Sequence, residues 1–212
     1  MTDLLDIVLR LDVHLLEMVR QYGVWIYAIL FAIIFSETGF VVTPFLPGDS
    51  LLFVAGAISA SGAMNVHLLA ALLLLAAALG NSVNYAIGRW LGRHFFTDRG
   101  SRWLNPKHLE KAHAFYEEHG GKAVVISRFL PIVRTYIPFV AGMAAMSPRQ
   151  FTFFNVAGAA LWVGSLLYAG FFFGNIPWIR GNLTAIIVGI IVVSLVPLAL
   201  AYLRSRLRAR EA

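Results

Sequence analysis

Long apolar stretches with very few charged residues dominate this sequence. Of its 212 residues, 59% are hydrophobic and only 13% are charged. A soluble domain carries roughly 45–50% apolar and about 25% charged residues. This chain therefore has too few charges to cover a surface in water, which excludes an ordinary soluble enzyme. We predict an all-α, polytopic membrane protein with a single membrane domain over residues 1–212.

Three segments are apolar and long enough to cross a membrane, since a spanning helix needs about 20 residues. They are residues 66–90, 151–173 and 183–203. Residues 1–21 instead place apolar and charged residues at helical spacing, which predicts an amphipathic interfacial helix. Residues 94–121 are the only extended polar region, and we expect an amphipathic cytoplasmic helix with a loop there.

Two further apolar segments, residues 24–61 and 122–146, are interrupted by charges, glycines and prolines. A proline removes a backbone donor and clashes with the carbonyl four residues earlier, so a straight helix is not expected in either. Non-helical backbone inside a membrane is tolerated where it lines a cavity. We therefore predict two re-entrant, broken segments, and these residues shape their backbone: Gly39, Pro44, Pro47, Gly48, Pro131, Pro138 and Gly142.

The distribution of Lys and Arg predicts the orientation of the chain. Seven lie in the 88–122 connection and four in the basic tail, residues 204–212, whereas the 174–182 loop has one. The tail and the central connection are therefore expected in the cytoplasm, where the tail contacts anionic lipid head groups. The formal net charge of +6 follows from this arrangement, and we expect no nucleic acid as a partner.

This orientation makes the two broken segments enter from opposite faces, each followed by a span, which is the plan of an inverted repeat. Ser36-Glu37 lies 11 residues before Pro47, and Ser127-Arg128 lies 11 residues before Pro138. A Val-Ala-Gly sequence follows in each segment, at 54–56 and 140–142, but its offset differs by five residues.

Away from their ends, the membrane-embedded stretches contain only four charged residues: Glu37, Asp49, Arg128 and Arg134. Each would cost roughly 2.5–3.5 kcal/mol at the centre of an isolated membrane helix. Such charges persist when they pair or line a polar cavity, so we expect all four in one shared site. An ion-pair lock between the two broken segments is the structural alternative, although buried salt bridges stabilise little compared with apolar packing.

The two arginines predict a site for a phosphate head group, because a guanidinium presents a planar fork that matches phosphate. Glu37 and Asp49 would repel phosphate unless one of them is protonated. Burial opposes ionisation of a carboxyl and a nearby arginine favours it, so a titration near neutral pH is expected. Protonation would release the arginines for phosphate, and protons are thus a predicted partner. No cofactor, metal or enzyme chemistry is required.

The same residues carry a resemblance to the DedA family of bacterial inner-membrane proteins, which is related to eukaryotic lipid scramblases with the VTT domain. The shared motifs are Glu37 with Phe45-Leu46-Pro47-Gly48-Asp49-Ser50, Gly88-Arg89-Trp90-Leu91-Gly92, and Arg128-x-x-Pro131-x-x-Arg134-x-x-x-Pro138-x-x-Ala141-Gly142-x-x-x-Met146. They lie in order over about residues 20–200. Val124 departs from the family, which often has an aromatic residue there.

The resemblance implies proton-motive-force-dependent translocation of undecaprenyl phosphate, the lipid carrier of cell-wall synthesis, across the inner membrane. By position, Glu37 and Asp49 match the essential acids of the family, and Arg128 and Arg134 match its essential arginines. An equilibrating phospholipid scramblase is the alternative that the eukaryotic relatives suggest. A lipid phosphatase is disfavoured, because the broken segments lack a histidine and the chain lacks cysteine.

Other polar and aromatic residues receive simpler interpretations. The histidines of residues 94–121 do not follow a His-Glu-x-x-His pattern, so a solvated helix is expected there rather than a metal site. Asn81, Asn84 and Asn155 either hydrogen-bond the broken segments or make ordinary contacts between helices. Trp25, Trp103, Trp162 and Trp178 are expected only to pack or to anchor the chain at the membrane interface.

Overall fold

The computed structural model describes residues 11–39, 48–97, 120–130, 133–174, 176–182, 185–186 and 188–189. All regular structure in these residues is helical. This confirms the all-helical prediction for the described part of the chain. The predicted third span, the polar region from residue 98 to 119 and the basic tail lie outside the described residues or almost entirely so.

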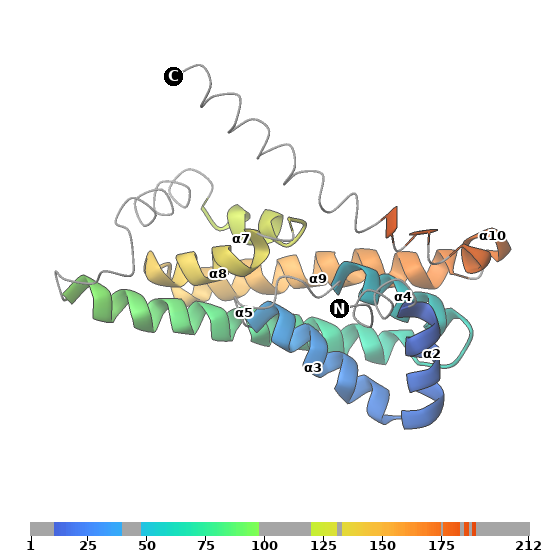
Figure 1. The fold of residues 1–212 in the computed structure, drawn as a ribbon. Helices are drawn as coiled ribbons and strands as arrows, with labels where there is room; N and C mark the ends of the chain where they lie inside the picture. The colour runs from blue at the N-terminus through green and yellow to red at the C-terminus, as the bar shows by residue number, and fades with distance from the viewer. Residues whose placement is uncertain are drawn as a thin grey trace, which may run out of the picture.

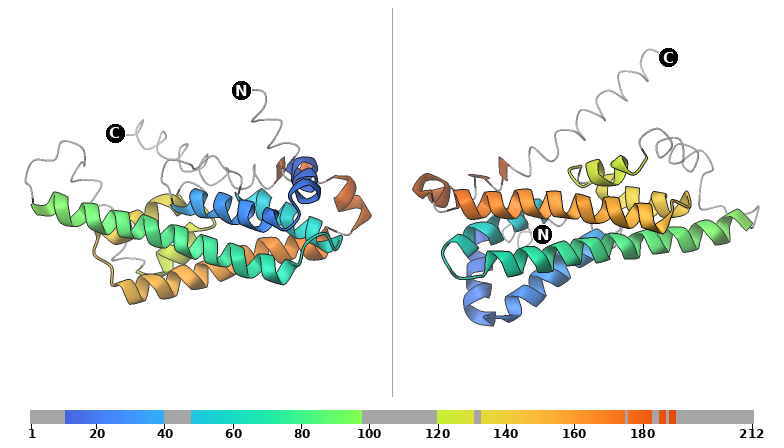
Figure 2. Two further views of the ribbon diagram at one scale, coloured as in Figure 1. Left: turned by 90° about the horizontal axis from the view of Figure 1, so that it is seen from below. Right: turned by 180° about the vertical axis from the view of Figure 1, so that it is seen from behind.

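Two long antiparallel helices form the centre of the molecule (Figures 1 and 2). Helix α5 comprises Val66–Thr97, and helix α9 comprises Pro148–Phe173. Both contain a stretch that is long and apolar enough to cross a membrane, Val66–Gly92 and Pro148–Phe173. The first two predicted spans are thus confirmed as helices of sufficient length. Ser147 caps the N-terminus of α9, because its hydroxyl accepts a hydrogen bond from the Gln150 backbone amide. Pro148 occupies the first helical position, where its missing N–H costs nothing.

Each predicted broken segment contains two described helices, and residues 40–47 of the first segment lie outside the described residues. The first comprises α3 (Trp25–Gly39) and α4 (Gly48–Ala60), and the second comprises α7 (Lys122–Ser127) and α8 (Val133–Met143). None of these four helices reaches the length of a membrane span. One expectation needs correction: Pro138 does not interrupt the second segment, because it lies inside α8. The break falls instead between Ser127 and Val133.

The broken segments pack on the long helices in a crossed pattern. Helices α3 and α8 pack mainly on α5, whereas α4 and α7 pack mainly on α9. Glycines permit the closest approaches: a Cβ on Gly56 of α4 would overlap the carbonyl oxygen of Leu167 in α9, and a Cβ on Gly142 of α8 would overlap that of Tyr85 in α5. Helix α4 of the first segment is thereby held against α9, which follows the second segment. Helix α8 of the second segment is held against α5, which follows the first.

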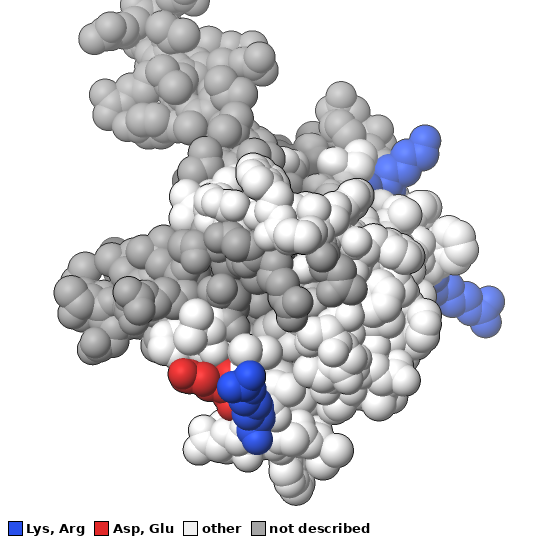
Figure 3. Space-filling view, turned by 90° about the vertical axis from the view of Figure 1, so that its right-hand side faces the viewer, with Lys and Arg blue, Asp and Glu red and all other residues white. Residues whose placement is uncertain are grey.

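The ends of the described chain carry shorter helices. Helix α2 (Leu11–Tyr22) is the described part of the predicted amphipathic helix, and its Leu15 is buried in the apolar core. Helix α10 (Pro177–Gly181) follows α9. The end of the molecule that bears α2 and α10 shows mostly uncharged residues, with few charges on the described surface (Figure 3).

Candidate functional site

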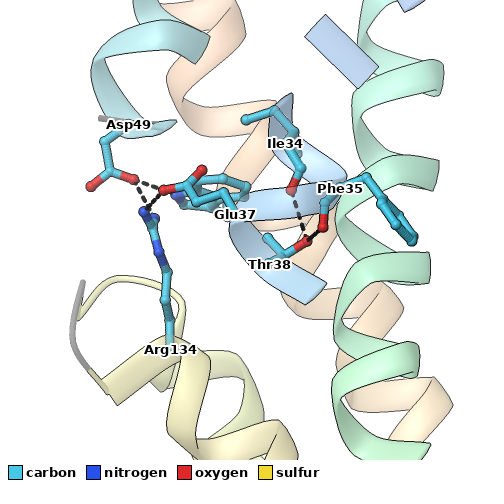
Figure 4. A network of polar contacts seen from close by, with 7 residues as sticks. Ile34, Phe35, Glu37, Thr38, Asp49 and Arg134 are labelled. Atoms are coloured by element: carbon cyan, nitrogen blue, oxygen red, sulfur yellow. Dashed lines mark hydrogen bonds and ion pairs between the residues drawn. The ribbon is translucent and has the colours of Figure 1, made fainter. Parts of the chain in front are cut away.

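Three of the four predicted charges meet in one buried cluster (Figure 4). The Arg134 guanidinium, from α8, donates through Nη1 to Asp49 Oδ1 of α4 at 2.9 Å and through Nη2 to Glu37 Oε1 of α3. Glu37 is fully buried, Arg134 is 6% exposed, and the Asp49 side chain is 16% exposed. One arginine therefore bridges the two arms of the first broken segment to the second segment.

Local structure explains how the two acids come together. Glu37 lies in the last turn of α3, and that helix ends at Gly39, which packs against Gly80 of α5. Asp49 is the second residue of α4, where the helix dipole favours a negative charge. Gly48, between them, leaves room for the Glu37 carboxylate, because a Cβ there would overlap it.

Arg128 is also buried, at 2% exposure, but its partners are neutral. Its Nη2 donates to the Asn155 side-chain oxygen Oδ1 at 2.6 Å and to the carbonyl oxygens of Ala77 and Asn155 at 3.3 and 3.4 Å. Its Nε makes no hydrogen bond with the described residues. The expected convergence is therefore incomplete, because no acid of the described residues forms an ion pair with Arg128.

Trp162 joins the two arginines, a role that the sequence interpretation missed. This buried residue of α9 donates from Nε1 to Asp49 Oδ1 at 2.8 Å. Its ring lies 5.1 Å from the Arg134 guanidinium carbon and 6.0 Å from that of Arg128. The expectation that Trp162 only packs or anchors is thus wrong. The available signal was its spacing of seven residues from Asn155, which places both on one helix face.

Two of the asparagines in the long helices hydrogen-bond the second broken segment. Asn155 accepts from Arg128 and donates to the Ala78 carbonyl oxygen at 2.9 Å, and Asn84 donates to the Thr135 carbonyl oxygen at 2.7 Å. Of the two interpretations left open by the sequence, hydrogen bonding to the broken segments is therefore confirmed for Asn84 and Asn155.

The predicted backbone residues divide into three groups. Gly39, Gly48 and Gly142 lie at close helix contacts. Pro138 is helical. Pro44, Pro47 and Pro131 lie outside the described residues. Within the described part of the chain, no group of three or more His, Asp or Glu side chains could hold a metal ion.

Comparison with known proteins supports the family assignment. The family model of the VTT domain matches residues 46–172. The chain is 54% identical to protein DedA of Escherichia coli (strain K12) over 211 residues, which cover 99% of this chain and 96% of that protein. It is 38% identical to inner membrane protein YqjA of the same strain over 180 residues, or 84% and 80% of the two chains.

An uncharacterised membrane protein of Mycobacterium leprae (strain TN) is 40% identical over 169 residues, which cover 80% of this chain and 76% of that protein. No solved structure matches the chain. The match to the VTT domain extends from just before Asp49 to near the end of α9, and so includes three of the four buried charges. The chain belongs to the DedA family of VTT-domain membrane proteins.

Proposed function

We propose that this protein translocates undecaprenyl phosphate, or a similar lipid phosphate, across the bacterial inner membrane by using the proton-motive force. The observation that carries the proposal is the pair of buried arginines around Trp162. Arg134 is held by two acids, whereas Arg128 has neutral partners and a buried Nε without one among the described residues. A bound phosphate oxyanion would supply the missing counter-charge.

The charge balance of this site supports coupling to protons. With both acids ionised, Glu37, Asp49, Arg128 and Arg134 have a formal sum of zero. One proton on an acid leaves a net charge of +1, and the site then favours an anion. Because Glu37, Arg128 and Arg134 are buried, their interactions are weakly screened by solvent. Proton entry and phosphate binding would therefore promote each other.

The structural alternative, an ion-pair lock, accounts for Arg134 alone. Arg134 links α8 to α3 and α4 through ion pairs, as a lock requires. Arg128 forms no ion pair with a described acid. A purely structural role would leave its buried charge with a desolvation cost and no compensating attraction. This asymmetry favours a binding site.

The crossed helix packing supports an inverted repeat and alternating access within one membrane domain. Gly56 and Gly142, the glycines of the two Val-Ala-Gly sequences, occupy matching positions: each lies against the backbone of the long helix that follows the other segment. In the proposed repeat, α3, α4 and α5 correspond to α7, α8 and α9, with the four charges between the halves. The broken segments would be re-entrant, and the C-terminal tail would lie on the cytoplasmic side, near anionic lipid.

An assay in proteoliposomes tests this proposal against an equilibrating phospholipid scramblase. Movement of undecaprenyl phosphate and of phosphatidylethanolamine is followed in parallel, with and without an imposed pH gradient. We expect gradient-dependent movement of the lipid phosphate and little movement of phosphatidylethanolamine. Equal movement of both lipids without a gradient would favour the scramblase, and no movement of either would reject both.

A further inference from the structure

Trp162 distinguishes the two acids of the charge cluster. Asp49 Oδ1 accepts two hydrogen bonds, one from Arg134 Nη1 and one from Trp162 Nε1. Glu37 Oε1 accepts from Arg134 Nη2, and its other oxygen, Oε2, faces Gly48 and makes no side-chain hydrogen bond with the described residues. Arg134 is therefore one of two hydrogen-bond donors to Asp49, but it is the principal partner of Glu37 (Figure 4).

This asymmetry matters when Arg134 leaves the acids to bind an anion. Asp49 would keep the indole N–H, and its side chain retains some exposure. Glu37 is fully buried and would lose its only described ion-pair partner, keeping only the Gly48 backbone beside its carboxylate. A buried charge that loses its partner carries a large penalty, which protonation removes. The departure of Arg134 therefore requires a proton on Glu37 and none on Asp49.

We propose that Trp162 is a positioning residue that holds Asp49 ionised, so that Glu37 is the carboxyl whose protonation releases Arg134. The indole also lies against both guanidinium groups, and cation–π attraction offsets part of their mutual repulsion. This inference rests on the proposed function for its role in transport. Its structural part, the division of labour between the acids, can be tested without a transported lipid.

In the part of the chain that the structure describes, few other ionisable groups face Glu37. Asp49 comes from α4 and Arg134 from α8, and the Arg128 guanidinium lies 6.0 Å from the Trp162 ring. On α5, His67 and Arg89 lie roughly 20 and 14 Å along the helix from Gly80, which packs beside Glu37's neighbour Thr38. Helix α2 carries His14, Glu17 and Arg20 and adjoins the far end of α3, about 18 Å from Glu37 along that helix. The charge cluster itself therefore dominates the protonation of Glu37.

Infrared difference spectroscopy of the full-length protein in membranes tests the assignment directly. Spectra across the neutral pH range report the C=O stretch of any carboxyl that gains a proton. We expect Glu37→Gln to remove a titrating band that Asp49→Asn retains. Trp162→Phe keeps an aromatic ring but lacks the N–H, so a second carboxyl band should appear as Asp49 begins to share the proton. Trp25→Phe, at an exposed tryptophan on α3, is the matched control and should leave the wild-type spectrum.

Transport of undecaprenyl phosphate supplies the second readout. Glu37→Gln should abolish the pH dependence, whereas Asp49→Asn should lower the rate and keep the pH dependence. Trp162→Phe should lower the rate roughly tenfold, the scale of one hydrogen bond to a charged group. It should lower the rate no further in an Asp49→Ala background, which removes the oxygen that accepts from the Trp162 N–H.

Three results would overturn the inference: no titrating band that depends on Glu37, a band that depends on Asp49 instead, or a Trp162→Phe spectrum identical to that of Trp25→Phe. Failure of the proposed function looks different. In that case wild-type protein moves no lipid phosphate while the spectra still separate the two acids.

Discussion

Arg128 and Arg134 are six residues apart, and both are buried, but they are compensated in different ways. Arg134 donates to two carboxylates, whereas Arg128 donates to an amide oxygen and to backbone carbonyls. Removing one partner of a buried ion pair leaves an uncompensated charge, which costs about 3–5 kcal/mol. Removing Arg128 instead eliminates a charge that no described acid pairs with. The two arginines should therefore respond differently to substitution.

We predict that Arg134→Ala lowers the thermal stability of the purified protein considerably more than Arg128→Gln does. The reason is that Arg134→Ala strips Glu37 and Asp49 of their shared partner. Melting temperatures in one detergent provide the measurement. Both variants should lose transport of lipid phosphate, so the loss in Arg128→Gln occurs in a well-folded protein. An equally large loss of stability in Arg128→Gln would support the ion-pair lock.

Gly48 provides a second residue-scale prediction. A Cβ at this position would overlap the Glu37 carboxylate, so Gly48→Ala should displace Glu37 from Arg134 and reduce transport at least tenfold, given a loss of about 1.5–3 kcal/mol for a hydrogen bond to a charged group. Gly164→Ala is the matched control, because a Cβ on Gly164 meets nothing within 4 Å. If Gly48→Ala transported as well as Gly164→Ala, the Glu37–Arg134 contact would be unimportant for function.

At the scale of helices, close packing through glycine fixes the positions of the helices that carry Asp49 and Arg134. Helix α4, which carries Asp49, approaches α9 through Gly56, and α8, which carries Arg134, approaches α5 through Gly142. In both contacts the obstacle is backbone, which cannot move aside as a flexible side chain can. Overpacking of this kind typically costs about 1–3 kcal/mol.

Gly56→Ala and Gly142→Ala should therefore each lower the free energy of unfolding by about 1–3 kcal/mol or more. Gly164→Ala should be neutral or slightly stabilising, because alanine favours a helix over glycine. Unfolding in a denaturing detergent, followed by circular dichroism, measures the difference. Stability equal to that of the Gly164→Ala control would show that α4 and α8 are not held at these contacts.

The sequence predicted two broken segments, but it did not correctly predict which prolines of the two segments correspond to each other. Charges and prolines in apolar surroundings predicted that residues 24–61 and 122–146 are broken segments. In the second segment, residues 128–130 lie between α7 and α8, outside both helices. Pro138 was misjudged, because one missing amide donor does not end a helix that neighbours support. Pro47 and Pro138 are thus not equivalent: Pro47 precedes α4, whereas Pro138 lies within α8. The Val-Ala-Gly sequences are the better match.

The candidate site was likewise predictable in part. Scarcity of charge identified Glu37, Asp49, Arg128 and Arg134, and three of them form one cluster. The sequence did not show that Arg128 pairs with Asn155 and that Trp162 lies beside both arginines. Tryptophan and asparagine are also common in ordinary helix contacts, so their role depends on which helix faces meet. Only the tertiary arrangement determines that.

At the scale of the whole molecule, four shorter helices, α3, α4, α7 and α8, pack on two long apolar helices. The family assignment and the apolar composition make this a membrane protein. In the proposed mechanism, the proton and the lipid phosphate use the same buried centre, so each must influence the movement of the other. Transport by the wild-type protein should therefore depend on the pH gradient. Arg128→Gln, which removes one of the charges proposed to bind phosphate, should abolish transport.

The most direct measurement is the translocation of undecaprenyl phosphate in proteoliposomes under an imposed pH gradient, with wild-type protein and Arg128→Gln compared side by side. The Arg128 variant is chosen because no described acid pairs with this arginine, so its loss should leave the fold intact. Gradient-dependent movement in wild type, absent in a folded Arg128→Gln protein, is the predicted result. Equal movement by both proteins, or none by a folded wild type, would contradict a lipid-phosphate site at the buried arginines.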